Sequence, residues 1–216
     1  MNILEVMKAR HSVRQYSGRK IEIEKREILG SLVKECNIES GLNIQIIFDE
    51  PKCFDSMMAH YGKFSGVENY IALVGEKGGN LEEKAGYYGE KIVLKAQELG
   101  LNTCWVAMTH GKSIAKVQKG EKLACIIAIG YGAVQGVAHK SKPVDKLCNC
   151  VSTMPDWFSK GMEAVLLAPT AMNQQKFYFT LENENITAKA GKGFYTKMDL
   201  GIVKYHFEAV TGRKVE

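Results

Sequence analysis

Two short stretches of the chain carry side chains that suit a polar, anionic ligand. The first is Arg10-His11-Ser12-Val13-Arg14, in which three potential cations and a hydroxyl occur within five residues. Arginine forms forked, charge-assisted hydrogen bonds with phosphate, and these are about twice as strong as neutral ones. The stretch therefore predicts a phosphate cradle. A solvated basic turn has the same composition, and the residue types alone leave that alternative open.

The second stretch runs from Pro169 to Gln175. The apolar run at 157–168 predicts a helix, which Pro169 cannot continue, and the aromatic run at 177–179 predicts a strand. A helix that ends here presents the Thr170 hydroxyl, the Asn173 amide and free backbone groups to the polar edge of a ligand. The alternative is an ordinary corner between a helix and a strand.

The elements that must position these stretches follow from the spacing of apolar residues. Helices are predicted at 2–10, 22–36, 87–100, 157–168 and 198–212, and extended segments or strands at 43–48, 70–75, 101–108, 124–132 and 177–179. In the helix at 22–36 we expect an inward face formed by Ile28, Leu29, Leu32 and Val33. The segment 183–193 is interpreted as a loop, and no element is predicted for 50–66.

Parts of this pattern recur along the chain. Residues 28–48 and 160–180 each predict an apolar helix, a short polar corner and a strand. The helices at 87–100 and 199–212 each carry an early and a terminal glycine: Gly89 and Gly100, then Gly201 and Gly212. A glycine inside a helix costs about 1 kcal/mol relative to alanine, so Gly89 indicates close packing. The repeat predicts one domain, 1–216, built from half-repeats at about 1–150 and 151–216.

Composition excludes several classes of partner. The 216 residues, 45% hydrophobic and 25% charged, suffice for one sizeable core. The net charge of +5 is spread over interspersed Lys and Glu without a basic stripe, so no nucleic-acid partner is expected. The N-terminal residues lack the apolar core of a signal peptide and no apolar run reaches membrane-spanning length, so we expect a cytoplasmic protein without a membrane partner.

The cysteines give a weak metal signal. Cys148 and Cys150 form a C-x-C pair and, with His139, offer a zinc or thiol site as an alternative hypothesis. Paired zinc ligands usually have two intervening residues, so no metal is expected, and free thiols in a reducing compartment are the preferred interpretation.

Taken together, these segments resemble the flavin-dependent nitroreductase family. Four motifs, covering most of the chain, carry the resemblance. The motif R-[RH]-S-x-[RK] is matched by Arg10, His11, Ser12 and Arg14, and the motif P-[ST]-x-x-N-x-Q is matched by Pro169, Thr170, Asn173 and Gln175. The motif G-L-x-T-C-W is matched by Gly100, Leu101, Thr103, Cys104 and Trp105. The motif I-G-Y, followed by K-x-[KR]-P, is matched by Ile129, Gly130, Tyr131, Lys140, Lys142 and Pro143.

The resemblance implies an α+β fold of three α/β/α layers, with a mostly antiparallel central sheet and a pseudo-two-fold within one chain. It also implies bound FMN. The implied phosphate ligands are Arg10, Ser12, Lys140 and Lys142, with His11 as a backbone or phosphate contact. Arg14 would lie near the flavin pyrimidine ring. Thr170, Ala171 and Asn173, in the motif that begins at Pro169, would contact the isoalloxazine edge. The segment Cys104, Trp105, Val106, Ala107 and Met108 would line its other side.

One departure from the family pattern concerns the oligomeric state. In the usual member the P-[ST]-x-x-N motif follows the first helical pair and two subunits share each flavin site. Here residues 35–43 lack the proline, and the motif lies in the second half of the chain. This is similar to a monomeric branch in which a second half-repeat takes the place of the partner subunit.

The implied activity is an FMN-dependent oxidoreductase with ping-pong hydride transfer. NADH or NADPH would be the co-substrate, and a nitro compound, quinone or similar small molecule the acceptor. Because the cofactor carries the chemistry, no acid–base residue is required and no catalytic residue is named. A flavin-binding sensor or carrier without turnover is the alternative. The sequence leaves the acceptor and the choice of nicotinamide nucleotide open.

Overall fold

The computed structural model describes residues 2–150 and 154–216. The chain divides into two compact units. The sheet unit comprises Ala9–Leu81 and Ile92–Val137. The hairpin unit comprises the start of the chain to Lys8, Glu82–Lys91 and Ala138–Glu216. The helix α4 (Leu81–Glu98) therefore contributes residues to both units. The half-repeats with a boundary near residue 150 stay a prediction.

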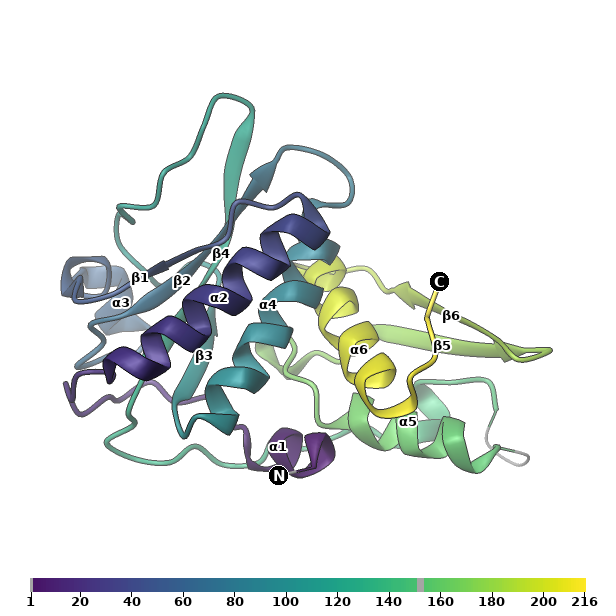
Figure 1. The fold of residues 1–216 in the computed structure, drawn as a ribbon. Coiled ribbons are helices and arrows are strands. Elements are labelled where there is room, and N and C mark those ends of the chain that lie inside the picture. The colour runs from purple at the N-terminus through teal and green to yellow at the C-terminus, as the bar shows by residue number, and fades with distance from the viewer. Residues whose placement is uncertain (1, 151–153) are drawn as a thin grey trace. The chain divides into compact units, whose positions relative to one another are not determined.

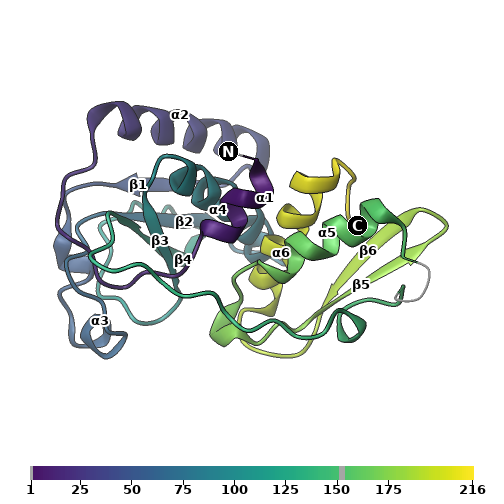
Figure 2. The ribbon, with the colours of Figure 1, turned by 90° about the horizontal axis from the view of Figure 1, so that it is seen from below.

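The sheet unit is built on an antiparallel four-stranded sheet in the order β1-β2-β4-β3. Besides its part of α4 it holds α2 (Ile23–Ser40), β1 (Gln45–Ile47), η1 (Pro51–Cys53), α3 (Met57–Tyr61), β2 (Tyr70–Glu76), β3 (Asn102–Val106) and β4 (Glu121–Gly130). Figures 1 and 2 show α2 running along one face of this sheet. Residues 70–75 of β2 and 125–130 of β4 are buried, as expected for continuous apolar strands at the centre of a sheet.

The inward face of α2 differs from the prediction at one residue. Leu29, Val33, Cys36 and Ser40 are buried, whereas Ile28 is exposed. The buried positions recur at spacings of three and four, which defines one face of a helix. Ile28 precedes Leu29 by one residue and is therefore rotated by about 100° away from that face.

The hairpin unit combines helices with a two-stranded antiparallel sheet, β5-β6. Besides its part of α4 it holds most of α1 (Ile3–Ala9), then η2 (Val144–Lys146), α5 (Asp156–Leu166), η3 (Ala171–Asn173), β5 (Phe177–Glu182), β6 (Asn185–Ala190) and α6 (Thr196–Thr211). The interpretation of 183–193 as a loop is wrong, since most of this segment is β6. Asn183 and Glu184, with φ of 49° and 69°, form the turn that joins the two strands.

Short segments pair with both outer edges of this hairpin. Phe179 of β5 donates its N–H to the Leu147 carbonyl at 2.8 Å, and Asn149 donates to the Phe179 carbonyl at 3.2 Å. On β6, Ala188 donates to the Glu216 carbonyl, and Glu216 donates to the Ile186 carbonyl, both at 2.9 Å. The hairpin therefore has backbone partners on both sides.

Two glycines allow α4 and α6 to pack with their backbones in contact. A Cβ on Gly201 of α6 would lie 1.9 Å from the Glu83 carbonyl oxygen, and one on Gly86 of α4 would lie 2.1 Å from the Met198 carbonyl oxygen. Gly86 and Gly201 thus provide close packing in this unit. The close packing expected of Gly89, which is buried, stays a prediction. Helix α4 begins at Leu81, six residues before its predicted start.

A fully buried pair of hydrogen-bonded side chains, Glu90 and His206, also joins these helices. The side chains of Glu90 on α4 and His206 on α6 are both 0% exposed, and His206 Nε2 lies 2.9 Å from Glu90 Oε1. The other ring nitrogen, Nδ1, lies 2.8 Å from the Ala164 carbonyl of α5. Since a carbonyl only accepts, Nδ1 carries a proton. His206 is thus a hydrogen-bonded core histidine.

The α+β fold with an antiparallel sheet is confirmed. The three-layer arrangement and the pseudo-two-fold stay predictions. Both terminal glycines of the predicted repeat have left-handed backbones where their helices end, with φ of 76° at Gly100 and 68° at Gly212.

Candidate functional site

In the sheet unit, the stretch 10–14 lies against the beginning of β3. Ser12 forms a parallel bridge with Thr103, and Val13 donates its N–H to the Thr103 carbonyl at 3.0 Å. Val13 is buried and belongs to the core cluster that also contains Cys104 and Val106. The structure therefore brings together two groups of predicted site residues, 10–14 and 104–108.

Three predicted phosphate-binding or flavin-binding side chains affect the ionisation of Cys104. Burial raises the pKa of the Cys104 thiol, while Arg14, a hydrogen bond from Ser12, and Arg10 act in the opposite direction. Because burial dominates, Cys104 is a neutral thiol at physiological pH rather than a nucleophile. The charges of Arg10 and Arg14 and the hydroxyl of Ser12 therefore all act on the same thiol.

These three side chains differ in exposure. Arg10 is buried, Ser12 is half-buried and Arg14 is exposed. The Arg14 guanidinium lies over the Phe64 ring, 6.0 Å from its centroid, and makes no hydrogen bond or ion pair within residues 2–150 and 154–216. It is therefore available to an anionic ligand. His11 is half-buried, and a Cβ on Gly136 would lie 2.7 Å from its Cβ, so the backbone at Gly136 packs directly on this stretch.

The segment 104–108 alternates between the core and the surface. The side chains of Cys104 and Val106 are buried, whereas Trp105 and Ala107 are half-buried and Met108 is exposed. Any contact of Val106 with a ligand is therefore a contact of its backbone. Trp105, Ala107 and Met108 can offer side chains.

In the hairpin unit, the corner between Pro169 and Gln175 has an unusual backbone. Three residues other than glycine have left-handed φ angles: Met172 at 50°, Asn173 at 53° and Gln175 at 45°. Such residues cost of order 1 kcal/mol each or more, and they persist where surrounding contacts hold them. Met172, at the tip, is 82% exposed. We refer to residues 170–175 as the polar corner.

The loop 139–142 holds one side of the polar corner. The Gln175 amide is buried; it donates to the Lys140 carbonyl at 2.8 Å and accepts from the Lys142 N–H at 2.7 Å. Asn173 donates to the same Lys140 carbonyl at 2.9 Å and accepts from Gln175 at 2.8 Å. His139 Nε2 and the Ser141 hydroxyl both bond to the Leu166 carbonyl, where α5 ends. The loop and the corner thus form one hydrogen-bonded structure.

The two lysines predicted to bind phosphate are used differently in this structure. The Lys142 ammonium donates to the carbonyls of Gln174 and Gln175, at 2.8 and 3.0 Å. The Lys140 ammonium is exposed and has no hydrogen bond or ion pair to any residue that the structure describes. Lys142 therefore supports the polar corner, and Lys140 is the freer cation.

Helix α6 holds the other side of the polar corner through Asp199. Its Oδ1 accepts from the Ala171 N–H at 2.9 Å and its Oδ2 from the Gln174 side-chain amide at 2.7 Å. Asp199 is only 2% exposed. Burial raises the pKa of Asp199 to about 6, although both hydrogen bonds lower it.

Sequence reasoning missed Gln174, Gln175 and Asp199 as candidate site residues. Gln175 was quoted in a motif but given no role, although it is the most buried residue of the corner. Asp199 had a signal that could have found it, because it lies between Met198 and Leu200 in an apolar helix start. A carboxylate there is buried and needs hydrogen-bond donors, which a neighbouring corner can supply.

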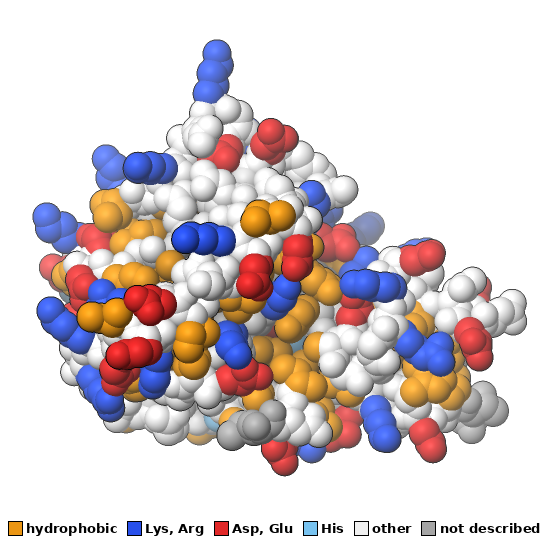
Figure 3. Space-filling model, in the orientation of Figure 1, with side chains coloured by type: hydrophobic (Ala, Val, Ile, Leu, Met, Phe, Trp, Pro, Cys, Tyr) orange, Lys and Arg blue, Asp and Glu red, His pale blue; other side chains and the backbone are white. Residues whose placement is uncertain are grey.

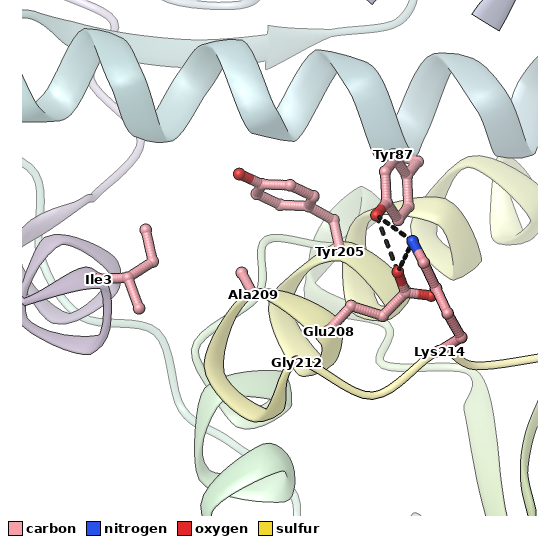
Figure 4. Close-up of a pocket in the computed structure, with 7 residues that line it drawn as sticks. All are labelled: Ile3, Tyr87, Tyr205, Glu208, Ala209, Gly212 and Lys214. Atoms are coloured by element: carbon pink, nitrogen blue, oxygen red, sulfur yellow. Dashed lines mark hydrogen bonds and ion pairs between the residues drawn. The ribbon is translucent and has the colours of Figure 1, made fainter. Parts of the chain in front are cut away.

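The hairpin unit also contains a hollow of about 420 Å³ between α1, α4 and α6, shown in Figure 4. Its polar groups are bonded to one another: Glu208 accepts from the Tyr87 hydroxyl at 2.8 Å and from the Lys214 ammonium at 2.7 Å. Burial, followed by Glu208, raises the pKa of Tyr87 to about 12. This hollow contains none of the predicted site residues.

Two further observations concern the described part of the chain. Within it, no group of three or more His, Cys, Asp or Glu side chains is arranged to hold a metal ion, and no helix is both long and apolar enough to span a membrane. On the face shown in Figure 3, positive and negative side chains are interspersed.

A family model described as Putative TM nitroreductase matches residues 2–211. The chain therefore belongs to this nitroreductase family, which places it among the oxidoreductases and confirms the resemblance drawn from the sequence. No curated protein matches the chain.

Solved structures agree with this assignment at the level of the fold. A putative nitroreductase from Thermotoga maritima has 24% identity and a TM-score of 0.72, over 97% of this chain and 83% of that chain. A putative nitroreductase from Desulfovibrio desulfuricans, solved in complex with FMN, has 16% identity and a TM-score of 0.54, over 68% of this chain and 95% of that one. A nitroreductase family protein from Streptococcus pneumoniae has 13% identity and a TM-score of 0.51, over 66% and 96%.

Proposed function

We propose that this protein binds FMN and transfers hydride equivalents from NADH or NADPH to a small acceptor such as a nitro compound or a quinone. The observation that supports FMN most directly is that residues 10–14 lie against β3, where Arg10, Ser12 and Arg14 all act on Cys104, in a chain of the nitroreductase family. The FMN-bound relative from Desulfovibrio desulfuricans supports the same choice of cofactor.

The residues present fit the chemistry of a flavin mononucleotide. A phosphate monoester carries about two negative charges at neutral pH and prefers guanidinium, ammonium and hydroxyl donors. Arg10, Ser12 and the exposed Lys140 ammonium are donors of this kind. Arg14 would place positive charge near the pyrimidine ring. The polar corner would present Thr170, Ala171 and Asn173 to the isoalloxazine edge. Bound FMN would supply the two-electron chemistry.

The chain's own contribution is binding and orientation. The Arg14 guanidinium stabilises negative charge and so raises the affinity for the reduced over the oxidised cofactor. The neutral thiol of Cys104 takes no part in covalent chemistry. We further propose a monomer with one flavin per chain, because the polar corner that a partner subunit usually supplies is part of the same chain, and a cytoplasmic location.

The first test is whether the purified protein binds FMN at all. We expect a yellow protein, or one that becomes yellow on adding FMN, with one flavin per chain and the mass of a monomer in solution. Protein that stays colourless after FMN is added refutes the proposal. Oxidation of NADH or NADPH with a quinone or nitro acceptor then tests turnover, and its absence across several acceptors indicates a flavin carrier instead.

The second test is the substitution Asn173→Ala. It removes the hydrogen bonds to Lys140 and Gln175, each worth about 0.5–1.5 kcal/mol, so FMN affinity is expected to fall about tenfold while the protein stays folded. The matched control is Asn183→Ala, because Asn183 is also an exposed asparagine with left-handed φ, 49°, but lies in the turn of the β-hairpin. Equal FMN affinity in the two variants would mean that the polar corner has a purely structural role and does not bind FMN.

A similar pair tests the cationic stretch. Arg14→Ala is expected to weaken FMN binding, whereas Arg19→Ala, which removes an exposed arginine paired with Glu22, is not. Equal loss in both variants points to non-specific charge attraction.

A further inference from the structure

The polar corner depends on a carboxylate that no motif of the family resemblance contains. Asp199 is buried and its two oxygens each accept one hydrogen bond from the corner, from Ala171 N–H and from the Gln174 amide. Both donors flank Met172, the exposed tip with left-handed φ. A single side chain thus holds the corner immediately before and two residues after its tip.

The conformation of the corner is strained and is held by hydrogen bonds within the corner and to its surroundings. Three residues other than glycine have φ between 45° and 53°, which a chain adopts only when its surroundings fix it. The loop 139–142 bonds to residues 173–175, towards the end of the corner. Thr170 accepts from the Asn173 N–H at its carbonyl and from the Gln175 N–H at its hydroxyl, so the beginning of the corner is bonded to its end. The bond from Ala171 to Asp199 ties that beginning to α6. The Met172 N–H makes no hydrogen bond within the described residues.

From this geometry we infer that Asp199, in its ionised form, is a positioning residue for the flavin site: it holds the polar corner in the conformation that binds the isoalloxazine edge. The inference rests on the proposed FMN binding and extends it to a residue that touches the corner rather than the cofactor. It also predicts that binding depends on pH, because the two contacts need two acceptor oxygens.

The chemistry of the carboxyl group explains the dependence. An ionised carboxylate accepts both N–H donors, whereas a protonated one turns one oxygen into a donor and leaves one N–H without its acceptor. The groups that face Asp199 are uncharged: the Ala171 N–H, the Gln174 amide and, through its own N–H, the Tyr195 carbonyl. Burial raises the pKa of Asp199 to about 6. Titration therefore falls in a range that is readily measured.

Protonation of Asp199 is expected to affect flavin affinity and folding stability in opposite directions, so the two effects can be told apart. Because the folded-state pKa, about 6, lies above the ordinary value of 3.8, the folded protein binds this proton more tightly than the unfolded chain. Protonating Asp199 between about pH 6 and 4 therefore favours folding. Flavin affinity is expected to change in the opposite direction, so a loss of affinity on acidification does not follow from unfolding through this group.

The experiment compares flavin binding by the wild-type protein and by Asp199→Asn between pH 5 and pH 8. The phosphate of FMN itself titrates near pH 6, so riboflavin, which lacks it, is the main probe and FMN the second. For the wild type, affinity for riboflavin is expected to fall about tenfold from pH 8 to pH 5, because about one molecule in eleven remains ionised at one pH unit below the pKa. For Asp199→Asn it is expected to be low and independent of pH.

A second variant keeps the test valid if Asp199→Asn does not fold. Gln174→Ala removes one of the two hydrogen bonds that lower the pKa of Asp199, so the pH at which riboflavin binding falls is expected to move upwards. Hydrogen exchange of the peptide around Ala171 supplies a readout without flavin. In the apoprotein at pH 8, exchange there is expected to be faster in Asp199→Asn than in the wild type.

The outcomes distinguish this inference from the proposed function. If the wild type binds neither FMN nor riboflavin at any pH, the proposed function fails. If it binds flavin without a pH step, and Asp199→Asn binds equally well with unchanged exchange at Ala171, the inference about Asp199 is wrong while the proposed function stands. A pH step that disappears in Asp199→Asn and moves in Gln174→Ala supports it.

Discussion

Replacing Gly201 with alanine tests the close packing of α4 on α6. The new Cβ would lie 1.9 Å from the Glu83 carbonyl oxygen and 2.7 Å from the Tyr87 nitrogen. Since Cβ atoms essentially never approach other atoms closer than 3.0 Å, the two helices must separate by about 1.1 Å (3.0 − 1.9). Both obstructing atoms belong to the backbone of α4, so no side-chain rotation relieves the contact.

Two effects of opposite sign decide the magnitude. Alanine favours the helical conformation by about 1 kcal/mol relative to glycine. Overpacking a core costs about 1–3 kcal/mol, and separating the helices also strains the bonds of Lys204 to Glu83 and of His206 to Glu90, both within 2.9 Å. We therefore expect Gly201→Ala to lower the free energy of unfolding by about 1–2 kcal/mol.

Gly30→Ala is the matched control. Gly30 lies inside α2, and a Cβ there would meet nothing within 4 Å, so only the gain in helix propensity applies and stability is expected to rise by about 0.4–1 kcal/mol. The assay is urea unfolding followed by far-UV circular dichroism. A Gly201→Ala protein as stable as Gly30→Ala would refute the backbone contact between α4 and α6.

Two further predictions concern buried polar groups and backbone strain. Glu90→Leu leaves the His206 ring without its partner at Nε2 and is expected to cost about 3 kcal/mol of stability. In Glu90→Gln the amide can still donate to a neutral ring, so the expected cost is about 1 kcal/mol. Equal urea midpoints for the two variants would contradict the bond between these side chains. Met172→Val places a β-branched residue at φ 50° and is expected to lower the stability measured by thermal unfolding by about 1 kcal/mol or more. The control is Met57→Val, for which a loss of a few tenths of a kcal/mol is expected, because both methionines are over 80% exposed and only Met172 has a left-handed backbone. Similar losses in the two variants would mean that the corner is not strained.

Most helices and strands could be predicted because their apolar spacing is strong and local. The buried runs of β2 and β4 and the helix that ends before Pro169 were found near their true limits. The strand β6 was missed because it has only six residues, of which two are buried, and so gives little apolar signal. Its pairing with β5 is set by a two-residue turn of ordinary polar residues. Ile28 was misplaced because two adjacent isoleucine and leucine residues do not show which of them faces the core.

The candidate site was predictable in its residue types but not in its hydrogen bonds. The positions of Arg10, Ser12 and Arg14 beside β3 follow from a bridge between segments about ninety residues apart, which a single sequence does not reveal. The role of Lys142 in bonding carbonyls depends on the left-handed backbone of the polar corner. Asp199 was missed for the same reason, since its partners exist only once that corner has formed.

The short segments that flank the β-hairpin have a consequence for self-association. An isolated two-stranded sheet exposes unpaired N–H and C=O groups along both edges, and another chain can add a strand there. Here the backbone at Leu147 and Asn149 occupies such groups on β5, and that of Glu216 occupies them on β6. Anything that pulls the last two residues away from Ile186 and Ala188 would open that edge of β6 to edge-to-edge pairing with a second molecule.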